Sequence, residues 1–306
     1  MQTILVEKDV SKYREILTNS AGKKILKGMG KADFASEKLV KFHFHPFDFR
    51  HIYFEPSIME RARDNHTKNL RNDNFGLVLS RVNARETYDS AIVTKEYPYY
   101  KLAESSRGSY LIPLYLYGKK SCGDESVPCL NVQDSFLDFL KSKYGDIEIS
   151  GVEIMGYIYA LLYSRKFRKT FNDQLKEDFP KIPFPSDKKE FEILANLGNE
   201  LINLHLLNSD IKSQVEFNVQ GSNRIESVSF SEDKIYINQK QFFGGVPEDD
   251  YEFVIGGYQI LKKWLNERKG DTLSGKDIEH FMHVAGLLAK TREVMDEIDG
   301  NLAEMF

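Results

Sequence analysis

One stretch of the sequence, residues 42–54, reads Phe42-His43-Phe44-His45-Pro46-Phe47-Asp48-Phe49-Arg50-His51-Ile52-Tyr53-Phe54. It holds too many large apolar side chains for a solvated loop, so we expect a strand in a core. Pro46 has no backbone amide to donate, which disfavours a helix interior and fits a strand edge or a turn. A second apolar run, 75–80, follows Asn74 and is predicted to be a buried strand. The two runs flank a basic segment and can hold it rigidly over an anion.

The length and composition are those of a globular protein. The 306 residues suffice for one large domain or two ordinary ones, and 41% of them are apolar. The longest nearly unbroken apolar run, 154–163, is about half as long as a membrane span requires. Charged residues near the N-terminus leave no apolar signal-peptide core. We therefore expect a soluble, cytoplasmic protein that does not enter a membrane.

The net charge of -4 hides an asymmetry. Lys and Arg outnumber Asp and Glu over residues 1–120, whereas acidic residues outnumber basic ones over residues 121–306. A basic half joined to an acidic half suggests one surface for a polyanion and another that avoids it. A chance distribution of solvated charges would produce the same asymmetry, so both interpretations stay open.

Metal ligands are sparse in this sequence. Cys122 and Cys129 cannot complete a four-ligand zinc site alone, no Cys-x-x-Cys occurs, and we expect both to be reduced loop residues. His43 and His45 would place both rings on one face of a strand, with His51 nearby. Their neighbours are mostly aromatic, and no carboxylate or cysteine pattern completes a coordination shell. We therefore predict no metal site.

The periodicity of the chain predicts an α+β fold. In the first half, a small mixed β-sheet with loops is expected, with strands at 42–54, 75–81, 89–94 and 109–117. The second half is predicted to be mostly helical with an inserted β-hairpin, which the alternation over 215–243 indicates. We expect two parts, a β-rich part over 1–130 and a mostly helical support part over 131–306.

Local signals place the boundaries of the predicted helices. Ser150 and Glu153 have the spacing of a capping box, and the helical pattern after them breaks near Ser164. Residues 178–187 contain three prolines and are expected to be an extended connector. Further helical patterns run through 191–204, through 251–267, and from Ser274 onward.

Several sequence blocks occur in order along most of the chain. They are Pro46-Phe47-Asp48-x-Arg50, Asn74-x-Gly76-Leu77, Gly108-Ser109-Tyr110-Leu111-Ile112-Pro113, Asp178-Phe179-Pro180, Leu204-His205-Leu206-Leu207, Ile255-Gly256-Gly257-Tyr258-Gln259, Lys263-Trp264-Leu265 and Arg268-Lys269-Gly270. Together they resemble the C-terminal target-recognition (specificity) region of single-chain type ISP and type IIG restriction–modification enzymes, which methylate an adenine amino group. The resemblance rests on the order of the blocks, since no single block is specific.

The resemblance implies sequence-specific DNA target recognition for a fused adenine-specific DNA methyltransferase and restriction nuclease. The base-gripping motif of such methyltransferases needs two adjacent prolines, which this sequence lacks. No Gly-x-Gly loop follows a strand to hold S-adenosylmethionine. The chain is therefore expected to be a non-catalytic fragment without a cofactor. Its expected partners are double-stranded DNA and the methyltransferase and nuclease domains of a longer parent, which would bind S-adenosylmethionine.

Side chains that read bases are expected just after the strand 75–81. Arg reads guanine and Asn reads adenine by paired hydrogen bonds. Arg81, Asn83 and Arg85 occupy alternate positions of an expected extended segment, so all three should point into one groove, while Val82 and Ala84 face the protein. The cations before the strand suit phosphates. The predicted DNA-binding residues are Arg50, Arg61, Arg63, Lys68, Arg71, Arg81, Asn83, Arg85, Lys95 and Arg107.

Two other functions stay open on the residues alone. One is a protein-interaction or scaffolding domain that docks the methyltransferase and nuclease domains through its acidic half. The other is a hydrolase, although the nucleophile elbow Gly-x-Ser-x-Gly is absent. Salt-sensitive binding to DNA would separate recognition from scaffolding. A pocket with perturbed carboxylates would favour a hydrolase.

Overall fold

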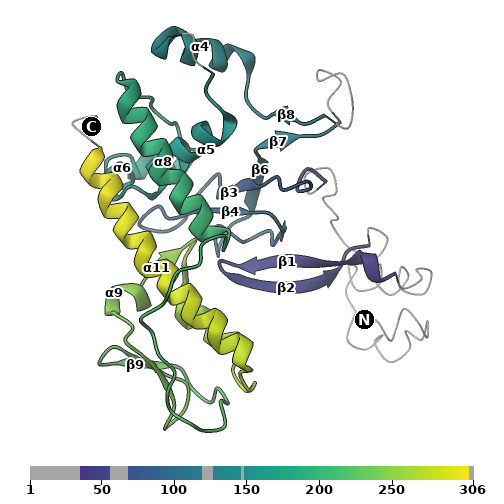
Figure 1. Cartoon of the computed structure of the whole chain (residues 1–306), viewed down its shortest axis with the longest axis vertical. Helices are drawn as coiled ribbons and strands as arrows, with labels where there is room; N and C mark the ends of the chain where they lie inside the picture. The colour runs from purple at the N-terminus through teal and green to yellow at the C-terminus, as the bar shows by residue number, and fades with distance from the viewer. Residues whose placement is uncertain (1–34, 56–67, 119–126, 146–147, 303–306) are drawn as a thin grey trace.

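The structure is a computed structural model that describes residues 35–55, 68–118, 127–145 and 148–302. Small sheets lie beside a layer of long helices, and the β1–β2 hairpin projects away from these helices (Figure 1). The described residues contain eight α-helices and five small sheets. The predicted α+β class is confirmed.

Residues 42–54 form a hairpin instead of one strand. β1 (Leu39–His45) pairs with β2 (Asp48–Tyr53) in antiparallel fashion. The chain turns at Pro46 and Phe47, where Phe47 has a φ of 60° and a fully buried ring that contacts His205. Pro46 thus lies in a turn, one of the two positions that its missing amide predicted. The other edge of β1 pairs in parallel with β5 (Tyr97–Pro98).

A second sheet, in the order β4–β3–β6, has a central strand that is buried along its whole length. β3 (Gly76–Ser80) is antiparallel to both β4 (Ala91–Thr94) and β6 (Ser109–Pro113). Gly76 lies opposite Thr94 and Pro113, and Ser80 lies opposite Ser109. The sheet therefore has a Gly76 end, which carries the loop 68–75, and a Ser80 end, which carries the segment 81–89.

The predicted strand 109–117 is interrupted at Leu114. β7 (Tyr115–Leu116) leaves the β4–β3–β6 sheet and pairs with β8 (Cys129–Leu130). Cys129 is disulfide-bonded, so the expectation of a reduced thiol is wrong at this position. Cys122, the other cysteine of that prediction, lies outside the described residues.

Two closely packed helices form the centre of the helical layer. They are α5 (Gly151–Tyr163) and α8 (Lys188–His205). A Cβ added at Gly198 would overlap the carbonyl oxygen of Gly156, so the close approach of the two backbones requires glycine. α11 (Gly275–Asn301) runs beside α8 (Figure 1).

The capping signals in the sequence were accurate. The Ser150 hydroxyl accepts from the Glu153 amide while the Glu153 carboxylate accepts from the Ser150 amide, as the predicted capping box requires. Ser164 ends α5, although two short helices follow it instead of one. A second capping box, from Ser274 and Asp277, starts α11.

The remaining elements are short, apart from α4. They are a 3-10 turn (Ser36–Lys38), α4 (Asp134–Tyr144), α6 (Arg165–Thr170), α7 (Asn172–Glu177), β9 (Ser229–Ser231), β10 (Lys234–Tyr236), β11 (Phe242–Gly244), α9 (Glu248–Tyr251), β12 (Val254–Ile255), β13 (Tyr258–Gln259) and α10 (Ile260–Asn266). The inserted hairpin is thus a three-stranded sheet, and the predicted helix 251–267 is a small hairpin followed by α10. The connector 178–187 is extended, as predicted.

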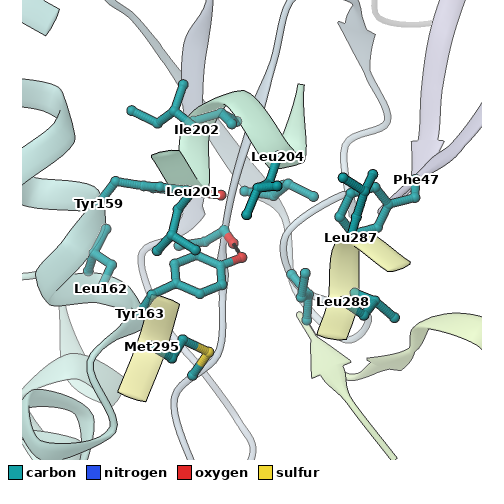
Figure 2. Close-up of a cluster of buried hydrophobic side chains, with 14 of the residues drawn as sticks. Phe47, Tyr159, Leu162, Tyr163, Leu201, Ile202, Leu204, Leu287, Leu288 and Met295 are labelled. Atoms are coloured by element: carbon teal, nitrogen blue, oxygen red, sulfur yellow. Dashed lines mark hydrogen bonds between the residues drawn. The ribbon is translucent and has the colours of Figure 1, made fainter. Parts of the chain in front are cut away.

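One continuous hydrophobic cluster joins the β-rich and helical parts. Figure 2 shows Phe47 from the hairpin beside Leu287 and Leu288 of α11, with Tyr159 and Tyr163 of α5 close by. Because core residues come from both sides of residue 130, the division into two parts stays a prediction. None of the described helices is long and apolar enough to cross a membrane.

Candidate nucleic-acid interface

Two buried asparagines anchor the loop 68–75 at the Gly76 end of the sheet. The Asn74 amide nitrogen donates to the carbonyl oxygens of Asn69 at 2.7 Å and Tyr115 at 2.8 Å. The Tyr115 backbone amide donates to Asn74 Oδ1 at 3.2 Å, and that of Tyr117 donates to Asn69 Oδ1 at 2.8 Å. Both asparagine side chains are 5% exposed. These bonds fix both ends of the loop to β7.

The tip of this loop is a tight turn that faces solvent. Asn72 and Asp73 have φ values of 54° and 61°, as the central positions of a type I′ turn require. The Asn74 amide donates to the Arg71 carbonyl at 3.1 Å and closes the turn. Arg71, Asn72 and Asp73 are all exposed, and the Arg71 guanidinium lies 4.3 Å from the centre of the Tyr117 ring. One guanidinium, one amide and one carboxylate therefore stand on a fixed backbone.

Further cations share the Gly76 end of the sheet. Lys68 is exposed at the start of the loop. Lys95 is half-buried and directly follows Thr94, which pairs with Gly76. Within the described ranges, no carboxylate forms an ion pair with Lys68, Arg71 or Lys95. Their charges are available to an external anion.

The segment 81–89 at the Ser80 end turns inward instead. Asn83 is 4% exposed. Its amide nitrogen donates to the Thr87 carbonyl at 3.3 Å and to Ser90 Oγ at 3.1 Å. Its side-chain oxygen accepts from the Arg85 amide at 2.8 Å, which is the hydrogen bond of an Asx turn.

The prediction that Arg81, Asn83 and Arg85 point the same way is wrong. Alternation holds only in a paired strand, and the Asx turn of Asn83 ends the extended conformation. Asn83 is buried, while Val82, which was expected to face the protein, is 43% exposed. Ala84 is also exposed.

Arg85 is engaged by two acidic residues. Its guanidinium forms ion pairs with Asp89 and, at 3.5 Å, with Glu104. Glu104 is fully buried and also accepts hydrogen bonds from Ser90 Oγ at 3.0 Å and Ser106 Oγ at 2.9 Å. Burial lowers the pKa of Arg85, and Glu104 opposes that shift. These contacts are those of a structural ion pair.

Arg81 also has a partner, but on the surface. Its Nε donates to Asp178 Oδ1 at 2.7 Å, and both side chains are more than half exposed. The hydrogen bond raises the pKa of Arg81 and lowers that of Asp178. Arg107 is exposed near the same end of the sheet, without an ion pair to any described residue. Arg61 and Arg63 lie outside the described residues.

Arg50 and Arg268 meet at one buried carboxylate. Asp48 is 1% exposed, and it accepts from Arg50 Nε at 3.1 Å and from Arg268 at 2.6 Å. Burial alone would raise the pKa of Asp48, but the hydrogen bonds from Arg268 and Arg50 outweigh it and lower the pKa. The Arg268 guanidinium also stacks 3.7 Å from the Trp264 ring. The sequence blocks that contain Asp48 and Arg268 gave no sign that these two side chains would meet.

The histidines His43 and His45 of β1 are buried. His43 is buried, with Nδ1 3.0 Å from Thr94 Oγ1, and burial lowers its pKa to about 3. Burial likewise lowers the pKa of His45 to about 4. In the part of the chain that the structure describes, no group of three His, Cys, Asp or Glu side chains could hold a metal ion.

Comparison with known proteins places this arrangement in a family. A model of the Type ISP C-terminal specificity domain matches residues 5–297. The chain belongs to the Type ISP C-terminal specificity domain family. The resemblance noted in the sequence is therefore confirmed, and it includes both ends of the β4–β3–β6 sheet. No curated protein matches the chain.

Solved structures share the fold of this specificity domain. One, "ATP-dependent Type ISP restriction-modification enzyme LlaBIII bound to DNA", is 20% identical over 97% of this chain, with a TM-score of 0.72. A nuclease-deletion mutant of the Type ISP enzyme LlaGI in complex with a DNA substrate mimic is 18% identical over 94% of the chain, with a TM-score of 0.67. The DrdV–DNA complex is 20% identical over 100% of the chain, with a TM-score of 0.73. The chain spans 21%, 22% and 32% of these three proteins, respectively.

Proposed function

We propose that this specificity domain selects the DNA sequence on which a longer restriction–modification protein acts. The observation that carries the proposal is the Gly76 end of the sheet, where Lys68, Arg71 and Lys95 have no carboxylate partner among the described residues. Phosphate contacts need cations whose charge is not already neutralised. The DNA in the complexes that this fold resembles supports the proposal.

In this proposal, the role of each cation depends on whether it already has a carboxylate partner. Lys68 and Lys95 contact phosphates, with Arg107 extending the footprint to the Ser80 end. Arg50 and Arg268 share the single carboxylate of Asp48, so one positive charge stays uncompensated, and the 39% exposed side chain of Arg50 can present it to a phosphate. Arg61 and Arg63 stay predicted phosphate contacts.

The chemistry of the longer protein would lie elsewhere in it. The structures that share this fold are three to five times longer than the chain, which leaves room for other domains. We assign methyl transfer from S-adenosylmethionine and DNA cleavage to such domains. The specificity domain then supplies only the choice of site.

The test is the salt dependence of DNA binding by the whole chain, measured by fluorescence anisotropy with mixed-sequence duplexes. If Lys68, Lys95, Arg107 and Arg50 each neutralise one phosphate, the slope of log K against log salt is about -3.6, from about 0.9 per phosphate. Lys68→Ala and Lys95→Ala should each reduce the slope by about 0.9. Lys240→Ala, an exposed lysine between β10 and β11, is the control. Absence of binding at low salt, or a slope near zero, would contradict the proposal.

A second function, docking of other domains, is favoured by an exposed apolar patch. Val82, Tyr110 and Phe179 are 43%, 48% and 38% exposed, and the rings of Tyr110 and Phe179 lie 5.2 Å apart. Phe179 borders an apolar cavity of about 220 Å³ between β6 and α5. Exposed apolar patches commonly mark contact surfaces. An affinity for DNA that does not change with salt concentration would favour this function over recognition.

A further inference from the structure

We propose that the turn Arg71-Asn72-Asp73 reads base edges in the major groove of DNA. This inference rests on the proposed function and gives the direct contacts to bases a position in the fold. The sequence analysis placed base reading at residues 81–85 and assigned Arg71 to phosphates. We exchange the two assignments here, because Asn83 and Arg85 have internal hydrogen-bond or ion-pair partners, whereas the side chains of the turn are exposed and form no ion pair with a described residue.

The backbone of the turn is fixed before any ligand binds. Asn69 and Asn74 together make four hydrogen bonds that tie both ends of the loop to each other and to β7. The Asn74 amide closes the turn onto Arg71. A rigid backbone lowers the conformational entropy that binding removes, and it keeps polar groups at the positions that discrimination between bases requires.

The chemistry of the tip fits base edges better than phosphates. Asp73 is an exposed carboxylate, which a phosphate backbone would repel. A carboxylate can instead accept a hydrogen bond from cytosine N4. Asn72 can bond the N6 and N7 atoms of adenine, and Arg71 the O6 and N7 atoms of guanine. Three consecutive exposed side chains therefore match three kinds of base edge.

The stacking of Arg71 adds to its selectivity. Its guanidinium lies 4.3 Å from the Tyr117 ring centre, and Tyr117 is 7% exposed. An aromatic ring under a guanidinium favours one orientation of its planar fork. A fixed fork is suited to two parallel hydrogen bonds with one guanine. A lysine at this position would keep the charge and lose that geometry.

The neighbouring cations give the turn its position on DNA. Lys68 precedes the turn in the same loop, and Lys95 follows the strand that pairs with Gly76. Phosphate contacts fix the register of a protein on the duplex, and base contacts then supply the sequence information. One end of the sheet thus contains both kinds of contact.

The chain offers a matched control turn. Glu232 and Asp233 join β9 to β10 and have φ values of 51° and 56°, close to those of Asn72 and Asp73. Both are exposed. Glycine accepts positive φ, so a glycine at any of these four positions removes the side chain and keeps the turn.

The experiment is selection of bound duplexes from a randomised pool by the whole chain, followed by sequencing. Asn72→Gly and Asp73→Gly should each lose preference at one base pair, by roughly tenfold or more. Arg71→Lys should lose one guanine preference while keeping the wild-type salt slope. Glu232→Gly and Asp233→Gly should enrich the wild-type sequence, and Lys95→Ala should weaken binding to all sequences equally.

The outcomes separate this inference from the proposed function. If the wild-type chain enriches a sequence and the three turn variants enrich the same one with unchanged preference, the turn does not read bases. If the wild-type chain binds the pool but enriches no sequence, target selection by this domain fails and this inference fails with it. A preference lost at separate base pairs in the three turn variants, and in neither control variant, supports the inference.

Discussion

Two polar segments adjoin β3 at opposite ends, and the fold directs them in opposite ways. The loop 68–75 uses Asn69 and Asn74 as anchors and leaves Arg71 to Asp73 in solvent. The segment 81–89 buries Asn83 and neutralises Arg85 with acidic residues. Both segments contain Arg, Asn and Asp, so the types of residue present do not separate them. The difference shows that a cation stays available to an external anion when the fold gives it no internal carboxylate.

The largest effect on stability should come from removing Glu104, the buried acid that pairs with Arg85 of the segment 81–89. Glu104→Ala leaves the half-buried Arg85 with one of its two acidic partners and leaves Ser90 and Ser106 without their acceptor. We expect a loss of about 3–5 kcal/mol in the free energy of unfolding, the cost of breaking a buried ion pair. Urea denaturation measures it. Glu86→Ala, an exposed acid in the same segment, should change stability by less than about 0.5 kcal/mol. Equal stability of Glu104→Ala and wild type would mean that Arg85 is not structural.

A smaller loss of stability should follow when Asn74, which anchors the loop 68–75 at the Gly76 end of the sheet, is removed. Asn74→Ala eliminates three hydrogen bonds and leaves backbone groups of Tyr115 unpaired. At about 1 kcal/mol for each bond, we expect roughly 2–3 kcal/mol from urea denaturation. Asn72→Gly, at the exposed tip, is the control and should be nearly neutral. Faster amide exchange confined to residues 68–75 should accompany the loss, and unchanged exchange there would contradict the anchoring role.

Acid should destabilise the protein in part through His43, which lies near the Gly76 end of the sheet. His43 bonds Thr94 beside Gly76, and burial together with Lys41 lowers its pKa to about 3. The unfolded state takes up a proton near pH 6.5 that the folded state does not, so stability is full above pH 6.5 and falls as pH decreases. Between pH 7 and pH 5 this histidine should account for about 2 kcal/mol.

Comparison of two proteins isolates the contribution of His43. Denaturation of wild type and His43→Gln at pH 7 and pH 5 should show a weaker pH dependence in the variant, because His45 and His205 still contribute in both proteins. His51→Gln, an exposed histidine of β2, should keep the wild-type pH dependence. Identical pH dependence in wild type and His43→Gln would show that His43 is not kept neutral by the fold.

The smallest effect on stability is expected at Arg81. Its ion pair with Asp178 is solvent-exposed, and such pairs add little to stability because solvent and salt screen them. Arg81→Ala should therefore unfold at nearly the wild-type urea concentration. It should also select the wild-type DNA sequence in a pool experiment. A changed preference at one base pair would move base reading to the Ser80 end and remove the distinction between the two segments.

Local chemistry explains what the sequence could predict. The capping boxes at Ser150 and Ser274, the buried strand 76–80 and the extended connector 178–187 depend on neighbours within a few residues. Pro46 could be recognised as incompatible with a helix, yet its place in a hairpin depended on how β1 and β2 pair. The ordered sequence blocks likewise identified the family, because they are read along the chain without knowledge of contacts.

By itself, then, the sequence determined the α+β class, the main helix starts and the family. Tertiary structure alone decided which polar side chains stay exposed, because their partners depend on how the chain folds and several of them are remote in the sequence. Asp178 is 97 positions from Arg81, and Arg268 is 220 positions from Asp48. Asn83 is turned inward by Ser90 and Thr87, while Asn69 and Asn74 are held by β7 and leave the tip between them exposed. Side-chain direction outside a paired strand follows these contacts and not the period of the sequence.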